Sequence, residues 1–206
     1  MKIALIGGTG SFGTALAVRL REAGYAVVIG SRDAERALAV AATLGVEGAT
    51  NEDAARAADF VVLTTKADGA VETARALREA IGKTPVLSVA AELSFTKAGV
   101  LPTSEATSIA ERIQDELDAP VIAGLHSLAA SNLGGEEAPD EDTLVCGDDP
   151  DAKAAMLELA GKVTSGRAID AGPLASARAL EGMTAVIVNV NKRYRAHAGL
   201  RVTGVH

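Results

Sequence analysis

The sequence predicts an α/β fold with a doubly wound parallel sheet. Short apolar runs of strand length alternate with longer stretches rich in Ala, Arg and Glu along most of the 206 residues. Several of these runs are apolar at almost every position, which is typical of strands covered on both faces. Strands and helices that alternate in this way are joined by right-handed crossover connections, so we expect a parallel sheet with helices on both sides.

The first half of the chain contains five expected strands separated by helices. Gly24 and Gly45 end two of the helices, Asp33 is expected to cap one, and Asn51 is expected to cap another. The expected strands are residues 1–6, 25–29, 46–48, 60–64 and 85–89, and the expected helices are residues 12–23, 33–44, 52–58 and 68–81.

The second half is less regular. Residues 90–107 have no clear periodicity and are expected to form a loop over a ligand, and the acidic residues 134–141 a surface loop. Pro173 and the Ala, Leu, Glu and Met that follow it favour a long helix over a strand. The expected helices are residues 108–117, 152–162 and 173–195, and the expected strands are residues 120–125, 143–146 and 167–170.

Composition excludes several classes of function. The chain has 20 Lys and Arg against 27 Asp and Glu, a net charge of −7, and no run of basic residues, so we expect no nucleic-acid partner. Only 2% of the residues are aromatic and none is Trp, which removes the stacking surfaces of single-strand binders. With three His and the single Cys146, a metal site made of protein ligands is not expected.

The chain is expected to be a cytoplasmic protein with no membrane partner. Lys2 is followed by only four apolar residues before Gly7, so a signal peptide is not expected. No apolar stretch has the length of a membrane span. A lone cysteine cannot form an internal disulfide, which fits a reducing compartment, and we interpret Cys146 as a small apolar strand residue.

A glycine-rich motif follows the first expected strand directly and opens the first helix. Gly8 is needed for the turn, Gly10 lets the backbone approach a pyrophosphate, and Gly13 allows the helix to pack closely on the strand. The alternative is a glycine-rich turn that binds no ligand. In this context the motif predicts a Rossmann-like dinucleotide-binding fold, with amide donors at the helix N-terminus. The motif reads Gly8-Thr9-Gly10-Ser11-Phe12-Gly13.

The end of the second strand predicts the cofactor. A site for NAD would place Asp or Glu there to bind the ribose 2′-OH, but this chain has Ser31 and Arg32, with Arg36 one helical turn later. A hydroxyl and two guanidinium groups suit a 2′-phosphate, so NADP is predicted over NAD. The alternative for the two arginines is an ordinary solvated helix face.

Two further segments are expected near the ligand. The loop after the fourth strand lies at the carboxyl edge of the sheet and is expected to line the adenosine side, unless it is an ordinary surface connection. From it we select Thr64, Thr65, Ala67 and Val71. His126 follows an apolar run and is either a residue of the cleft or a hydrogen-bonded structural group. No residue is assigned a catalytic role, and that includes His197 and His206.

Taken together, several motifs resemble those of the NADPH-dependent coenzyme F420 reductases. The resemblance runs from the first strand to the C-terminus, and the combination is more specific than the glycine motif by itself. The segments that carry it are Gly7-Gly8-Thr9-Gly10, Gly30-Ser31-Arg32, Val145-Cys146-Gly147-Asp148-Asp149, Asp170-Ala171-Gly172-Pro173-Leu174, Asn191-Lys192-Arg193-Tyr194 and His197-Ala198-Gly199-Leu200.

The resemblance implies hydride transfer between NADP(H) and the deazaflavin coenzyme F420 in a small homodimeric protein. The order of strands and helices along the chain predicts that residues 1–142 form an NADP-binding Rossmann domain and residues 143–206 a small C-terminal α/β extension packed on it. The resemblance places Ala130 near the nicotinamide and His126 near the deazaflavin, and small residues such as Ala129 and Ala130 permit the close approach of the two rings. It also assigns Thr9, Gly10, Ser11 and Phe12 to the pyrophosphate and Ser31, Arg32 and Arg36 to the 2′-phosphate.

Two segments depart from the family pattern. Lys66 follows Thr65 where the family usually has a proline, and residues 88–92, which end in Glu92, lack the prolines of the corresponding loop. Two alternatives therefore stay open. One is an NADPH-dependent reductase of another flavin or a small carbonyl compound, and the other is a non-catalytic NADP(H)-binding sensor whose C-terminal helix serves assembly.

Overall fold

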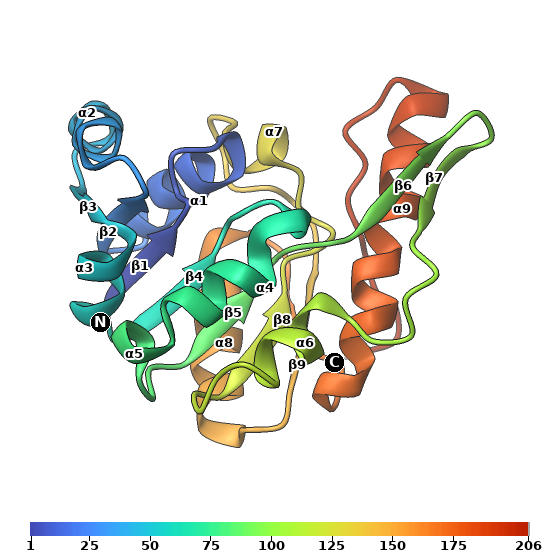
Figure 1. Cartoon of the computed structure of the whole chain (residues 1–206). Coiled ribbons are helices and arrows are strands. Elements are labelled where there is room, and N and C mark those ends of the chain that lie inside the picture. The colour runs from blue at the N-terminus through green and yellow to red at the C-terminus, as the bar shows by residue number, and fades with distance from the viewer. Residues whose placement is uncertain (206) are drawn as a thin grey trace.

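The computed structural model describes residues 1–205 and contains an eight-stranded sheet and a separate two-stranded hairpin (Figure 1). His206, to which the sequence assigns no catalytic role, lies outside the described residues. The strands are β1 (Lys2–Ile6), β2 (Ala26–Ser31), β3 (Glu47–Thr50), β4 (Phe60–Leu63), β5 (Val86–Ser88), β6 (Leu93–Thr96), β7 (Gly99–Pro102), β8 (Val121–Gly124), β9 (Thr143–Gly147) and β10 (Ala168–Asp170). The large sheet has the order β10-β9-β8-β5-β4-β1-β2-β3, and β6 pairs with β7.

Helices cover both faces of the large sheet. One face carries α3, α4, α5, α6 and the first half of α9, and the other carries α1, α7 and α8, with α2 beside β2 and β3. The helices are α1 (Ser11–Glu22), α2 (Ala34–Leu44), α3 (Asn51–Arg56), α4 (Ala67–Ala76), α5 (Arg78–Ile81), α6 (Ile109–Gln114), α7 (Ala130–Leu133), α8 (Pro150–Val163) and α9 (Ala177–Tyr194), which a 3-10 turn, η1 (Leu174–Ser176), precedes.

The core consists of two apolar layers separated by the sheet. Successive side chains of a strand point to opposite faces, so Ile6 packs under α3 and α4 whereas Leu5 packs under α1. Both side chains are fully buried. Burial of both faces explains why the central strands lack polar alternation in the sequence.

The order of the strands reverses between β1 and β4. From β1 the chain builds outward through β2 and β3, and it then crosses back to pair β4 with the other edge of β1. The carboxyl ends of these two strands meet where Ile6 is paired with both Gly30 and Leu63. A crevice outside this point is the usual ligand site of such sheets. The predicted doubly wound α/β fold is therefore confirmed.

Four expectations about local structure were wrong. The sheet is not wholly parallel, because β9 runs antiparallel to β8. Residues 90–107 are not only a loop, since they contain the hairpin β6–β7. The helix expected over residues 68–81 ends at Ala76 and resumes as α5. Thr50, not Asn51, caps α3, because its side chain accepts the backbone N–H of Asp53.

The C-terminal part of the chain continues the same sheet. Strands β9 and β10 extend it beyond β8, and α8 packs in the layer of α1. The division at residue 142 stays a prediction. The long helix expected after Pro173 is present as α9, and it lies beside the hairpin at one side of the molecule (Figure 1). Within residues 1–205, no helix has the length and apolar character needed to cross a membrane.

Candidate functional site

The glycine motif forms a tight turn at the carboxyl end of β1. Gly7 adopts a φ of +72°, a conformation that side-chain-bearing residues rarely adopt, and its N–H donates to Asn51 Oδ1 at 3.1 Å. The N–H of Gly8 donates to the carbonyl oxygens of Leu5 at 3.1 Å and Gly30 at 3.0 Å. Hydrogen bonds to β1, β2 and α3 therefore fix the turn in place.

The other two glycines of the motif have different structural roles. A Cβ on Gly13 would lie 2.6 Å from Gly8 Cα, so α1 packs on the turn too closely for any side chain. A Cβ on Gly10 would meet only the oxygen of Gly7, at 3.9 Å, and would otherwise point into open space. No side chain caps the N-terminus of α1, so its first amide N–H groups are free to donate to a ligand.

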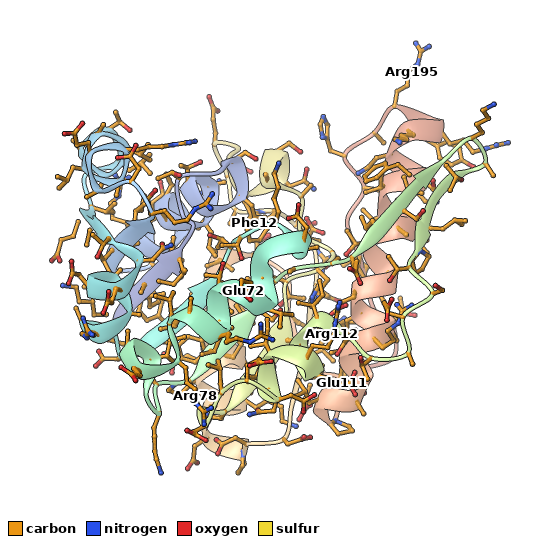
Figure 2. The ribbon with its side chains drawn as sticks, in the orientation of Figure 1. Phe12, Glu72, Arg78, Glu111, Arg112 and Arg195 are labelled. Carbon is orange, nitrogen blue, oxygen red and sulfur yellow. The ribbon has the colours of Figure 1, made fainter. Side chains whose placement is uncertain are left out.

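A cleft of about 690 Å³ opens at this turn, outside the carboxyl ends of β1, β2 and β4. Of the residues predicted from the sequence, it is lined by Thr9, Gly10, Ser31, Arg32, Arg36, Thr64 and Thr65. It is also lined by Gly7, Asn51, Lys66, Asp68, Gly69 and Thr73, which were not selected. A neighbouring hollow of about 370 Å³ shares Ser31 and Arg32 with it and continues along α4, on which Figure 2 labels Glu72.

Both arginines of the cleft are exposed and unpaired. Within residues 1–205, no carboxylate lies within ion-pair distance of Arg32 or Arg36. Asp33 is occupied in capping α2, where its side chain accepts the N–H of Arg36 at 3.1 Å. Ser31 is buried beside them, at the last position of β2. Two free guanidinium groups and a hydroxyl fit a 2′-phosphate.

The loop after β4 forms the opposite wall of the cleft. Thr64 is attached to β1, since its N–H and its hydroxyl each donate to the oxygen of Ile6 at 2.9 Å. Thr65 lies against the turn, because its Cγ2 would be 2.6 Å from a Cβ on Gly7. Its hydroxyl oxygen is buried and has no hydrogen-bond partner in the described chain. The cleft thus offers both charge and unsatisfied hydrogen bonds to a dinucleotide.

A second cleft of about 490 Å³ adjoins the first and shares Lys66 and Asp68 with it. Its other lining residues come from α4, from the β5–β6 connection and from the hairpin: Ala67, Ala91, Glu92, Leu93, Ser94, Phe95 and Thr103. Of these, only Ala67 was selected from the sequence. The two clefts therefore meet at Lys66 and Asp68.

Glu92 in the second cleft is paired. Its Oε2 accepts a hydrogen bond from Arg112 Nη2 at 2.9 Å and one from the Thr103 hydroxyl at 3.3 Å. Arg112 lies on α6, between α4 and α9 (Figure 2). The carboxylate therefore joins the β5–β6 connection to α6 and to the end of the hairpin. Its charge is compensated.

His126 lies beneath the surface rather than in either cleft. It is 7% exposed, and its Nε2 lies 3.2 Å from the oxygen of Ala90, so in the neutral ring Nε2 carries the proton that this oxygen accepts. Burial lowers the pKa of His126 to about 4, and Nδ1 is buried without a partner in the described chain. The preceding residue, Leu125, adopts a φ of +63°. His126 thus contacts the loop that leads into the second cleft, and its contact with the deazaflavin stays a prediction.

The remaining predicted residues lie near the clefts but do not line them. Gly8 and Gly13 form the packed base of the turn, and Phe12 lies at the N-terminal end of α1 (Figure 2) with Ser11 before it. Val71 packs on the core from α4. Ala129 and Ala130 begin α7, which contacts α1. Their ligand contacts stay predictions.

Asn51 is the residue of the cleft that sequence reasoning misassigned. It follows β3 directly, as Arg32 follows β2, so the rule that ligands lie at carboxyl ends of strands points to it. A polar residue before a helix also matches a helix cap, and this is the role that the sequence pattern predicts for Asn51. The register places Thr50 beside Ser31, which brings Asn51 under Gly7.

Neither a metal site nor a reactive thiol is present among residues 1–205. No group of three or more His, Cys, Asp and Glu side chains there could hold a metal ion. Cys146 is fully buried in β9, as expected of an apolar strand residue, and burial raises the pKa of its thiol to about 12.

Comparison with known proteins places the chain in one family. Residues 2–92 match the family described as NADP oxidoreductase coenzyme F420-dependent. The chain is 37% identical to the F420-dependent NADP reductase of Methanothermobacter thermautotrophicus, in a match that covers all of this chain and 96% of the relative. It is 33% identical to the F420-dependent NADP reductase of Methanocaldococcus jannaschii, in a match that covers all of this chain and 99% of the relative. A crystal structure from Arthrobacter sp. FB24, of a protein proposed to be an F420-dependent NADP reductase, superimposes with a TM-score of 0.84 over 98% of this chain and 99% of the other, at 26% identity. The chain belongs to the family of coenzyme F420-dependent NADP oxidoreductases.

Proposed function

We propose that this protein transfers a hydride between NADP(H) and coenzyme F420. The observation that carries the proposal is the pair of adjoining clefts at the carboxyl edge of the sheet, the first of which presents the unpaired Arg32 and Arg36. A dinucleotide with a 2′-phosphate fits that first cleft, and the second cleft is open to a partner ring system. The names of the relatives support the same pair of substrates.

Residues of the first cleft would bind the dinucleotide. Thr9, Gly10 and the free amides of α1 would hold the pyrophosphate, and Ser31, Arg32 and Arg36 the 2′-phosphate. The adjoining hollow beside α4 would hold the adenine. The small Ala129 and Ala130 at the start of α7 would leave room for the nicotinamide ring.

When both are bound, the two cofactors would supply the redox chemistry, a hydride transfer between the nicotinamide and the deazaflavin. The protein's contribution is to bind both rings together and to exclude water from between them. His126 is not required as an acid, since burial keeps its imidazole neutral above a pKa of about 4. Its contact with Ala90 positions the loop of the second cleft.

A direct assay tests the proposal. Purified protein is mixed with NADPH and oxidised F420, and the loss of the deazaflavin's visible absorbance is followed, with NADH in a parallel reaction. We expect rapid bleaching with NADPH and much slower bleaching with NADH. Binding of NADPH without bleaching would overturn the assignment of the second substrate, and equal rates with NADH would overturn the role of the two arginines.

We also propose that the protein acts as a homodimer in the cytoplasm. Several large apolar side chains of the hairpin and α9 are exposed, with Phe95 at 70% and Val186 at 59%, and a second copy of the chain would cover them. NADP(H) is a soluble intracellular cofactor, which supports the location. Analytical ultracentrifugation tests the dimer, and a monomer at micromolar concentration would contradict it.

The two alternatives from the sequence have no comparable support. A reductase of another flavin or carbonyl compound would turn over NADPH with that acceptor and not with F420, and a sensor would bind NADPH without turnover. The F420 assay separates the proposed function from both alternatives, and a repeat with another flavin or a small carbonyl compound as acceptor separates the alternatives from each other.

A further inference from the structure

Lys66 is the one residue of positive charge among the described residues that line the second cleft. It stands at the N-cap position of α4, between β4 and the helix, and its side chain is exposed. No carboxylate of residues 1–205 lies within ion-pair distance of its ammonium group. It also lines the dinucleotide cleft, so it lies at the junction of the two sites.

The other cations near the second cleft do not line it. Arg112 donates to Glu92 at 2.9 Å, and both side chains are about one-third exposed, which leaves that pair close to neutral. Lys192 lies over the ring of Phe95, with its Nζ 5.2 Å from the ring centre, and is not among the residues that line the cleft. An anionic ligand in the second cleft would therefore meet Lys66 as its free counter-charge.

We propose that Lys66 binds the phosphate of the deazaflavin substrate and makes this protein prefer a deazaflavin with an anionic side chain over one without it. The inference rests on the proposed function, and it adds the residue that recognises the charged part of F420. A flexible ammonium group suits this role, because it reaches a phosphate as a point charge without fixed geometry.

Asp68 supplies an internal comparison. It lines both clefts, is exposed, and stands in the first turn of α4, two residues from Lys66. Its carboxylate repels the same phosphate that Lys66 attracts. Substitution of the two residues should therefore change the affinity for F420 in opposite directions.

The test compares F420 with its precursor that ends at the ribityl group and lacks phosphate and glutamates. For each acceptor, kcat/KM is measured with saturating NADPH at low ionic strength. In Lys66→Met the ratio of the two kcat/KM values, F420 over precursor, is expected to fall about tenfold, the usual effect of losing one charged hydrogen bond. In Asp68→Asn the ratio is expected to rise. Added salt should lower the ratio in the wild type and change it little in Lys66→Met.

Two further variants serve as controls. Lys83→Met removes an exposed lysine between α5 and β5. This lysine lies before the amino end of β5, whereas the clefts lie at the carboxyl ends of the strands, so the ratio is expected to stay unchanged. Lys192→Met tests whether Lys192, and not Lys66, binds the phosphate of F420. An unchanged ratio in Lys66→Met, or a fall in Lys192→Met alone, would overturn the proposal, and so would a change confined to the KM for NADPH. A wild-type protein that fails to reduce F420 at all would instead refute the proposed function.

Discussion

Asn51 supports the glycine turn after β1 from beneath, since its Oδ1 accepts the N–H of Gly7 at 3.1 Å. The same oxygen would lie 2.9 Å from a Cβ on Gly30, so three segments distant in sequence meet at this atom. The contact ties the start of α3 to the ends of β1 and β2. Asn51 is also part of the cleft wall, and we expect it to position the turn for a dinucleotide.

Substitution Asn51→Ala should weaken NADPH binding with little effect on hydride transfer. The Gly7 amide would lose its acceptor, at a cost of about 1 kcal/mol in stability, and the turn would lose its order. We expect the KM for NADPH to rise roughly tenfold while kcat changes less than twofold. Gln114→Ala is the matched control, because it removes an amide that bonds to Val121, Leu117 and Ala119 far from the cleft. Gln114→Ala should lower stability and leave the KM for NADPH unchanged. A rise of this KM in both variants would contradict the positioning role of Asn51.

Removal of Arg32 or Arg36 should reduce the preference for NADPH over NADH. Each single alanine variant is expected to raise the KM for NADPH about tenfold and the KM for NADH much less, since only NADPH carries the 2′-phosphate. Stability should change by less than about 0.5 kcal/mol, because both side chains are exposed and unpaired. Steady-state kinetics with both cofactors gives the ratio, and Arg56→Ala on α3, which removes a surface pair with Glu52, is the control. Equal effects on the two cofactors would place the phosphate elsewhere.

Two glycine substitutions should separate ligand access from packing. Gly10→Ala adds a methyl group that points into the open cleft, so we expect thermal stability to hold and the KM for NADPH to rise at least tenfold. Gly13→Ala forces a methyl group to within 2.6 Å of Gly8, and overpacking of this kind costs about 1–3 kcal/mol. Thermal denaturation and NADPH titration of the two variants give the comparison. Similar losses of stability in both would show that Gly10 also has a packing role.

His126 should make the protein less stable in mild acid. Its pKa in the folded protein is about 4, below the ordinary value of 6.5, because burial disfavours the charged ring. Between these pH values the unfolded chain binds the proton and the folded protein does not. The free energy of unfolding therefore decreases as the pH falls from about 6.5 towards 4. The full loss is about 3 kcal/mol. Urea denaturation at several pH values should show this slope in the wild type and its absence in His126→Gln; parallel curves for the two proteins would be evidence against the buried neutral ring.

Sequence patterns were sufficient for the central architecture and for the main elements of the first cleft. The apolar strands alternate with amphipathic helices, so β1 to β5 and their crossovers could be expected from local composition. The glycine motif and the Ser31–Arg32 pair are contiguous segments whose chemistry depends on their position after a strand. The structure accordingly places both of them at the cleft.

Tertiary structure decided the features that depend on contacts between distant segments. The direction of β9 follows from how it docks on β8, not from its own residues, and the hairpin is held by the pairing of Asn189 on α9 with Val100. Asn51 has the composition of a helix cap, and only the β2–β3 register brings it under Gly7. The sequence by itself determined the fold class and the cofactor-binding chemistry, because both depend on short contiguous motifs. Only the folded chain shows that two clefts meet at Lys66 and that Arg112 neutralises Glu92. Each of these features brings together side chains that are far apart in the sequence.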